Sequence, residues 1–181
     1  MNINFIIDSK NKIVISCESD LTAFSEVSVW LINENNVVCK LGNDILLEIL
    51  SSLNNILLRV IKEEHAFYEP DSVGYNWNKW IYSLPEEPEE GEEEVDVYSD
   101  YWIWSTKKTG TWLYKYDEKD IVLEISPIYR WHFEEPENNL DYVSFKEFIN
   151  DYKVILRKKI DFKIAKDWQA ECQRYMELIK K

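Results

Sequence analysis

The sequence predicts an α+β fold, in which an antiparallel sheet of about six strands packs against one helix from the first half of the chain and two helices from its end. Three observations indicate this fold. Short alternating apolar runs are separated by turn-forming residues, residues 44–64 carry apolar positions at helical spacing, and the C-terminal third is amphipathic. The 181 residues are 45% hydrophobic, so we expect one well-buried domain over residues 1–181.

The first half of the chain predicts two hairpins and a helix. Residues 3–7 and 12–17 are β-branched apolar runs on either side of a cluster of turn formers, and residues 27–32 and 37–41 repeat this pattern. A helix is expected from Asp44 to about Glu64, with Asn43 as its cap and a broad apolar stripe that must be buried. Residues 65–85 lack steady periodicity, so we expect a loop with one short strand.

Residues 97–133 predict an antiparallel meander that carries most of the large aromatic residues. In its first strand we expect Tyr98, Asp100, Trp102 and Trp104 on one face, because successive strand side chains alternate. The second strand, residues 111–116, places Trp112, Tyr114 and Tyr116 together. The third, which ends at Pro127, has an apolar side formed by Ile121, Leu123 and Ile125.

Two helices are expected after the meander. Ser144 and Glu147 form a capping box, and helical spacing continues from there to about Lys159. The last helix, near residues 164–179, aligns one face made of Ala165, Trp168, Cys172, Tyr175, Met176 and Ile179.

The charge of the chain predicts what kind of partner it attracts. Its 34 acidic and 21 basic residues give a formal net charge of −13. In the segment 86–96, eight of eleven residues are acidic, so we expect an exposed loop, called here the acidic segment. Such a protein should be repelled by nucleic acid and by anionic membranes and attracted to a basic protein. The candidate partner-binding residues are Glu86, Glu87, Glu89, Glu90, Glu92, Glu93, Glu94 and Asp96, with Tyr98, Tyr101 and Trp102 as aromatic anchors.

Residues suited to catalysis or to cofactor binding are sparse in this sequence. The two histidines, His65 and His132, stand in no nucleophile motif, and four scattered glycines argue against a phosphate-binding loop. The acidic segment lacks the order of a calcium loop. Three widely spaced cysteines suggest reduced thiols in a cytoplasmic protein, and the N-terminus resembles neither a signal peptide nor a membrane span. We therefore expect a protein that is not an enzyme and that uses no metal or other cofactor.

The aromatic face of the meander leaves an alternative open. Trp102, Trp104, Trp112 and Tyr114 could stack on sugars or another small ligand, with Asp100 binding hydroxyl groups, although aromatic residues at period two more often pack a sheet on its helices. A nucleic-acid mimic is a further alternative. It would need carboxylates spaced along a rigid element, and a segment with a proline and a glycine suits that role poorly.

The C-terminal half carries a resemblance to known proteins. Residues 126–133 (SPIYRWHF), 142–149 (YVSFKEFI), Tyr152 with Lys153, and 165–168 (AKDW) resemble bacterial immunity proteins encoded beside polymorphic or contact-dependent toxins. The resemblance covers roughly residues 95–181 and transfers no functional residue. It implies a small, acidic, cytoplasmic protein that inactivates a toxin domain by covering its active site. A basic toxin, such as a nuclease, is the partner that this resemblance and the charge together predict.

Overall fold

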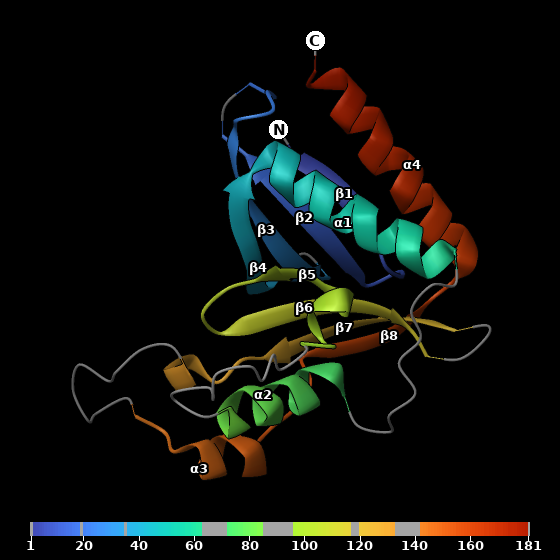
Figure 1. Ribbon diagram of the computed structural model, residues 1–181. Helices are drawn as coiled ribbons and strands as arrows, with labels where there is room; N and C mark the ends of the chain where they lie inside the picture. The colour runs from blue at the N-terminus through green and yellow to red at the C-terminus, as the bar shows by residue number, and fades with distance from the viewer. Residues whose placement is uncertain are drawn as a thin grey trace, which may run out of the picture.

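The computed structural model of the chain contains two antiparallel sheets and four α-helices in the part that it describes (Figure 1). It describes residues 2–18, 20–34, 36–62, 72–84, 96–116, 120–132 and 142–180. Sheet A contains strands β1 to β4, and sheet B contains strands β5 to β8. The predicted α+β class is confirmed, but the described residues form two sheets of four strands each where one sheet of about six was expected.

Sheet A is built from two successive hairpins, and both of them are confirmed. Its strands follow the order of the chain and pair antiparallel: β1 (Asn2–Ile6), β2 (Asn11–Cys17), β3 (Glu26–Asn33) and β4 (Asn36–Ile45). Alternate residues point to an inner face, where Phe5, Ile13 and Val29 are almost fully buried. This face lies against the helices α1 (Leu46–Ile61) and α4 (Phe162–Leu178), as Figure 1 shows.

Helix α1 (Leu46–Ile61) starts directly after β4, and the predicted cap at Asn43 is wrong. Strand β4 continues through Asn43 to Ile45, which precedes the helix without a side-chain cap. Backbone carbonyls of the loop before β3 cap the helix instead. Ser25 O accepts a hydrogen bond from the N–H of Leu46 at 2.8 Å, and Ala23 O accepts one from the N–H of Leu47 at 3.1 Å. The predicted apolar stripe is confirmed, and its buried members include Leu46, Ile49, Leu50, Leu53, Ile56, Leu57 and Val60.

Sheet B contains the predicted meander, with a shorter first strand than expected. Residues Ser99–Tyr101 form a 3-10 turn (η1), and β5 (Trp102–Ser105) pairs with β6 (Thr109–Lys115), which pairs with β7 (Ile121–Pro127). The expectation that Trp102 and Trp104 share a face is wrong, because the register shifts between them. Trp102 packs beside Trp112 on one side, while Trp104 joins the core on the other.

The fourth strand of sheet B replaces part of a predicted helix. The capping box at Ser144 and Glu147 is confirmed, but the helix that it starts, α3 (Phe145–Asn150), is short. The expected continuation to Lys159 is wrong, because residues Leu156–Ile160 form β8 and pair antiparallel with β7. This pairing satisfies the backbone groups of β7 on its second edge and buries Ile160.

Helix α2 (Val73–Ser83) lies where a loop with one short strand was expected, and that prediction is wrong. The hydroxyl of Ser72 caps it by accepting from the N–H of Tyr75 at 2.9 Å. Residues 63–71 of the predicted loop lie outside the described residues. In Figure 1, α2 lies on the side of sheet B that faces away from sheet A.

Two apolar clusters hold these layers together. The larger one joins the inner face of sheet A, α1, α4 (Phe162–Leu178) and one face of sheet B. Helix α4 confirms the predicted C-terminal helix, with Ala165, Trp168, Cys172 and Tyr175 buried. The smaller cluster lies between α2 and the other face of sheet B, so sheet B is covered on both sides. Among the described helices, none has the length and apolar character needed to cross a membrane.

Candidate binding surfaces

Most of the predicted acidic site falls outside the described residues. This applies to Glu86, Glu87, Glu89, Glu90, Glu92, Glu93 and Glu94. The described chain resumes at Asp96, where Oδ1 accepts hydrogen bonds from the backbone N–H of Tyr98 at 2.9 Å and of Ser99 at 3.0 Å. This carboxylate therefore fixes a turn at the end of the acidic segment.

The three predicted aromatic anchors differ in how much surface they offer. Tyr98 is half-buried against Trp80 of α2, with 5.9 Å between the ring centroids, and Trp102 is half-buried against Trp77, at 4.9 Å. The chain that leaves the acidic segment thus runs back along α2. Tyr101 is only 9% exposed and packs on Tyr114, so it presents little surface to a partner.

The aromatic face of the meander is mostly core. Trp112 and Tyr114 are fully buried between sheet B and α2, and Trp104 is 4% exposed in the larger cluster. The indole N–H of Trp104 donates to the carbonyl of Ile49 in α1 at 3.1 Å. Stacking of sugars on an exposed sheet face requires rings in contact with solvent, and three of these four rings are not.

A buried carboxylate that the sequence analysis missed lies between β7 and α2. Glu124 has no exposed surface, and its two carboxylate oxygens accept three hydrogen bonds. Oε1 accepts from the backbone N–H of Gly74 at 2.9 Å and from the hydroxyl of Ser126 at 2.9 Å. Oε2 accepts from the hydroxyl of Tyr114 at 2.9 Å, and Nε of Arg157 lies 3.8 Å from it.

The surroundings of Glu124 indicate a structural role. Burial, followed by the adjacent negative charge of Glu124, raises the pKa of Tyr114 far above its usual value, so this phenol stays a hydrogen-bond donor. The hydrogen bond of Glu124 with the N–H of Gly74 connects the N-terminus of α2 to β7, and the carboxylate is buried away from solvent. The signal in the sequence is one acidic residue inside an otherwise apolar strand, between Leu123 and Ile125.

His132 belongs to a packed aromatic group. Its Nε2 lies 3.3 Å from Oδ1 of Asn78, and its ring meets those of Trp77 and Tyr129 edge-on. Partial burial lowers the pKa of His132 to about 4, so the ring is neutral at pH 7. The other histidine, His65, lies outside the described residues.

Two of the three cysteines, Cys17 and Cys172, are buried, and Cys39 is half-buried. Among the described residues, Cys17, Cys39 and Cys172 form no disulfide. Burial raises the pKa of Cys39 to about 11 and that of Cys172 to about 12, which makes both poor nucleophiles at neutral pH. Within the residues that the structure describes, no three His, Cys, Asp or Glu side chains are grouped so as to hold a metal ion.

A hollow on the outer face of sheet A gathers three carboxylates, those of Glu18, Glu26 and Asp44. This acidic groove has a volume of about 710 Å³ and is lined by Ser16, Glu18, Glu26, Val27, Ser28, Lys40, Asn43, Asp44 and Ile45. Strand register creates it, because Ser16 pairs with Ser28 and Ser28 with Asn43. The ammonium of Lys40 lies 5.7 Å from the ring of Trp30, whose indole N–H donates to Ser16 Oγ at 3.2 Å.

The carboxylates of the acidic groove are available to a partner. Glu18 and Glu26 are exposed, and within the described part of the chain neither of them forms an ion pair. Three carboxylates face one ammonium group here, so the groove is locally negative. Sequence reasoning missed it because isolated polar residues on strands look like an ordinary solvated face until the register is known.

Comparison of the chain with protein-family models, with curated proteins and with solved structures gives no match in any of the three.

Proposed function

We propose that this protein binds a basic protein partner through its carboxylates and performs no catalysis. The observation that carries the proposal is the acidic groove, in which Glu18 and Glu26 lie exposed without an ion-pair partner among the described residues. Lysine or arginine side chains of a partner would supply the missing positive charges. The net charge of −13 acts in the same direction over a longer range, because it attracts a basic protein before contact.

The finer proposal is that the protein is an immunity protein, which neutralises a basic bacterial toxin by covering its active site. It rests on the resemblance carried by residues 126–133 and 142–149 and on the acidity of the chain. An inhibitor of this kind needs a complementary surface and no reactive group. The acidic groove provides such a surface, and the acidic segment would accelerate the encounter.

Two variants separate a local role of the groove from the effect of overall charge. Glu18→Lys with Glu26→Lys replaces two negative charges by two positive ones, so the net charge rises by 4, from −13 to −9. The control, Asp151→Lys with Glu177→Lys, makes the same change at two exposed positions, one at the end of α3 and one in α4. If the partner binds in the acidic groove, only the first variant loses most of its affinity for the partner.

The role of the acidic segment is tested by kinetics with the purified partner. Reversing Glu89, Glu90, Glu92 and Glu93 to lysine should slow association at low salt and change it little at high salt, because exposed charges are screened beyond a Debye length of about 8 Å at physiological ionic strength. Association rates that do not change at low salt would remove the acidic segment from the proposal. If the partner is a toxin, an equimolar amount of this protein should abolish its activity.

A further inference from the structure

Strand β1 forms one edge of sheet A and carries none of the charges that usually protect an edge strand (Figure 1). Its sequence is Asn-Ile-Asn-Phe-Ile. By contrast, β8 at one edge of sheet B carries Arg157, Lys158 and Lys159. Natural proteins place lysine or proline on exposed edge strands, because the unpaired backbone groups of an edge can pair with a strand of another protein. The side chains of β1 therefore do not oppose the addition of a further strand.

The backbone groups of alternate β1 residues point away from sheet A. The N–H of Ile7 donates to the carbonyl of Asn11 at 3.0 Å, which makes these two residues a hydrogen-bonded pair. Because such pairs alternate along an antiparallel ladder, Asn4 and Ile6 direct their N–H and C=O groups away from β2. The carbonyl of Ile6 confirms this direction, since it accepts from the indole N–H of Trp168 in α4 at 3.2 Å. The N–H and C=O of Asn4 and the N–H of Ile6 have no hydrogen-bond partner among the described residues.

A hollow of about 410 Å³ lies between this edge and α4. We call it the β1 groove, and its lining residues are Asn4, Phe5, Ile6, Ile7, Asp8, Ile164, Asp167, Trp168 and Glu171. Its apolar wall is held by packing, because the buried rings of Phe5 and Trp168 meet edge-on with 5.6 Å between their centroids. Ile164, half-buried on α4, extends this wall. A strand added to β1 would point every second side chain into the β1 groove.

The charges at the β1 groove favour a basic segment. Asp8, Asp167 and Glu171 line it, and none of the described residues that line it is basic. Two of these carboxylates have a cationic partner: Lys158 lies 3.1 Å from Asp8, and Arg174 lies 2.6 Å from Glu171. Asp167 is exposed and forms no ion pair within the described part of the chain. A lysine or arginine of a bound segment would supply this missing positive charge.

We propose that β1 binds an extended, basic segment of another protein as a fifth strand of sheet A. The backbone of the segment pairs with Asn4 and Ile6, which is the strand-addition mode of peptide recognition. An apolar side chain enters the β1 groove against Ile164 and Trp168, and a basic side chain meets Asp167. A second copy of this chain fits less well, because its own β1 has no basic residue. The inference does not rest on the acidic groove, since the two grooves share no residue.

A synthetic peptide, acetyl-Thr-Lys-Thr-Val-Thr-Lys-Thr-amide, probes this site in the full chain. As a strand it presents the valine and both lysines on one face, and its sequence reads the same in both directions, so that parallel and antiparallel addition are both tested. One comparison peptide carries N-methyl groups on its central Thr-Val-Thr, which removes the N–H groups that would pair with β1. The other has glutamate in place of both lysines. The first peptide should bind at least about tenfold more tightly than the N-methylated one and at least about threefold more tightly than the glutamate one.

Backbone NMR signals and variants at Asn4 locate the bound peptide. The amide protons of Asn4 and Ile6 should shift most and should exchange with solvent more slowly once they are paired. Asn4→Pro removes the N–H that faces the peptide, and proline is tolerated on an edge strand where the N–H points outward. This variant should weaken binding at least about tenfold, whereas the control Asn4→Thr keeps the N–H and should bind like the wild type.

Asp167→Lys is a second variant in case Asn4→Pro fails to fold. It should weaken binding of the lysine peptide at least about threefold, whereas Glu177→Lys makes the same charge change at an exposed position of the same helix and should leave binding unchanged. The proposal is overturned if this peptide does not bind up to about 10 mM, if the N-methylated peptide binds equally well, or if every folded variant at Asn4 and Asp167 binds like the wild type. Loss of binding in Glu18→Lys with Glu26→Lys, but not in these variants, would also overturn it, because the peptide would then occupy the acidic groove.

Discussion

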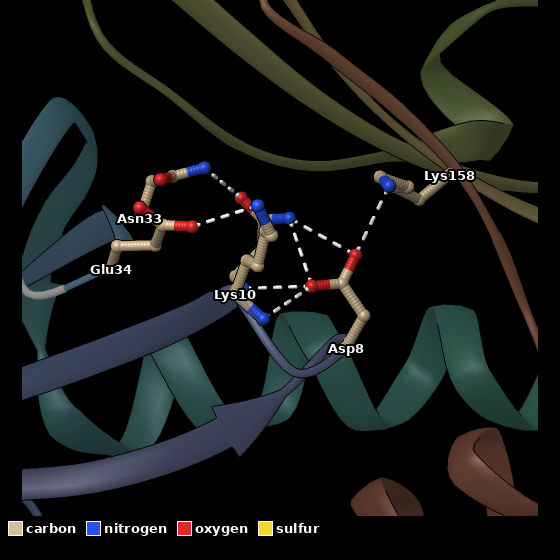
Figure 2. A network of polar contacts seen from close by, with 6 residues as sticks. Asp8, Lys10, Asn33, Glu34 and Lys158 are labelled. Carbon is tan, nitrogen blue, oxygen red and sulfur yellow. Dashed lines mark hydrogen bonds and ion pairs between the residues drawn. The ribbon is translucent and has the colours of Figure 1, made fainter.

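The ammonium group of Lys158 in β8 lies 3.1 Å from Oδ2 of Asp8, in the turn between β1 and β2, and this ion pair links the two sheets (Figure 2). Oδ1 of Asp8 accepts from the backbone N–H groups of Lys10 and Asn11, each at 2.8 Å. The side-chain amide of Asn11 donates to both carboxylate oxygens and accepts in turn from Asn33 at 2.7 Å. One carboxylate thus orders the turn and fixes it against sheet B.

This arrangement predicts how stability depends on pH. The hydrogen bond from the Lys10 N–H, then that from the Asn11 side chain, lower the pKa of Asp8 far below its usual value near 3.8. A carboxyl group with a lowered folded-state pKa stabilises the fold above its unfolded-state pKa, and this stabilisation is lost as the pH falls through the folded-state value. Asp8→Asn should therefore be less stable than the wild type at pH 7, and the difference should shrink as the pH falls from about 4 toward 2.

Urea unfolding at several pH values measures this difference. Lys10→Gln is the control, because it keeps the backbone N–H that Asp8 accepts and removes only the exposed ion pair of Lys10 with Glu34. Its effect should be within about 0.5 kcal/mol. A constant difference between wild type and Asp8→Asn from neutral to acidic pH would refute the role assigned to this carboxylate.

The buried Glu124 predicts a large effect from a small chemical change. Glu124→Gln keeps the shape of the side chain but replaces one acceptor oxygen by an NH₂ group. In one orientation this group would face the N–H of Gly74, and in the other it would face the donors of Tyr114 and Arg157. We expect the free energy of unfolding to fall by about 2–4 kcal/mol. Glu171→Gln, which breaks a helix-surface ion pair with Arg174, should cost less than about 1 kcal/mol and is the matched control. Equal losses in the two variants would contradict the account of Glu124.

Close packing around Gly74 leads us to expect that Gly74→Ala destabilises the protein, although alanine is the better helix former. Alanine is favoured over glycine inside helices by about 1 kcal/mol. A Cβ atom at Gly74, however, would lie 2.7 Å from Cβ of Ser126, 2.8 Å from the hydroxyl oxygen of Tyr152 and 2.9 Å from Cζ3 of Trp112. We expect Gly74→Ala to lower the free energy of unfolding by about 1–3 kcal/mol.

Lys79→Ala, at an exposed position of the same helix, should change stability by less than about 0.5 kcal/mol. Thermal and urea unfolding of both variants measure the comparison. A stabilised Gly74→Ala would mean that α2 does not press on β7 as closely as the structure places it.

The elements predicted from the sequence are those whose periodicity is long or whose end signals are local. The two N-terminal hairpins, the stripe of α1, the box at Ser144 and the face of α4 are of this kind. Helix α2 was missed because its buried face includes Gly74 and Asn78, which are not apolar. These residues are buried because Gly74 binds Glu124 and Asn78 binds the carbonyl of Pro127, and such contacts have no periodic signal.

Tertiary pairing explains the remaining differences. The apolar positions of residues 145–156 fit a helix, and only the free edge of β7 converts Leu156–Ile160 into a strand. Composition alone identified the acidic segment. The acidic groove depends instead on the register of β2, β3 and β4, which brings Glu26 of β3 and Asp44 of β4 close to Glu18, the residue after β2.

Capture of the partner from a lysate of the source cell tests the proposed function most directly. The immobilised wild type, the Glu18→Lys/Glu26→Lys variant and the Asp151→Lys/Glu177→Lys control are loaded at about 50 mM salt and eluted at about 500 mM, and the bound proteins are quantified by mass spectrometry. We predict that the wild type and the control retain the same basic protein in equal amounts and release it at high salt. The amount recovered on the groove variant should be at least about tenfold lower. Equal recovery of every bound protein on all three would contradict the account.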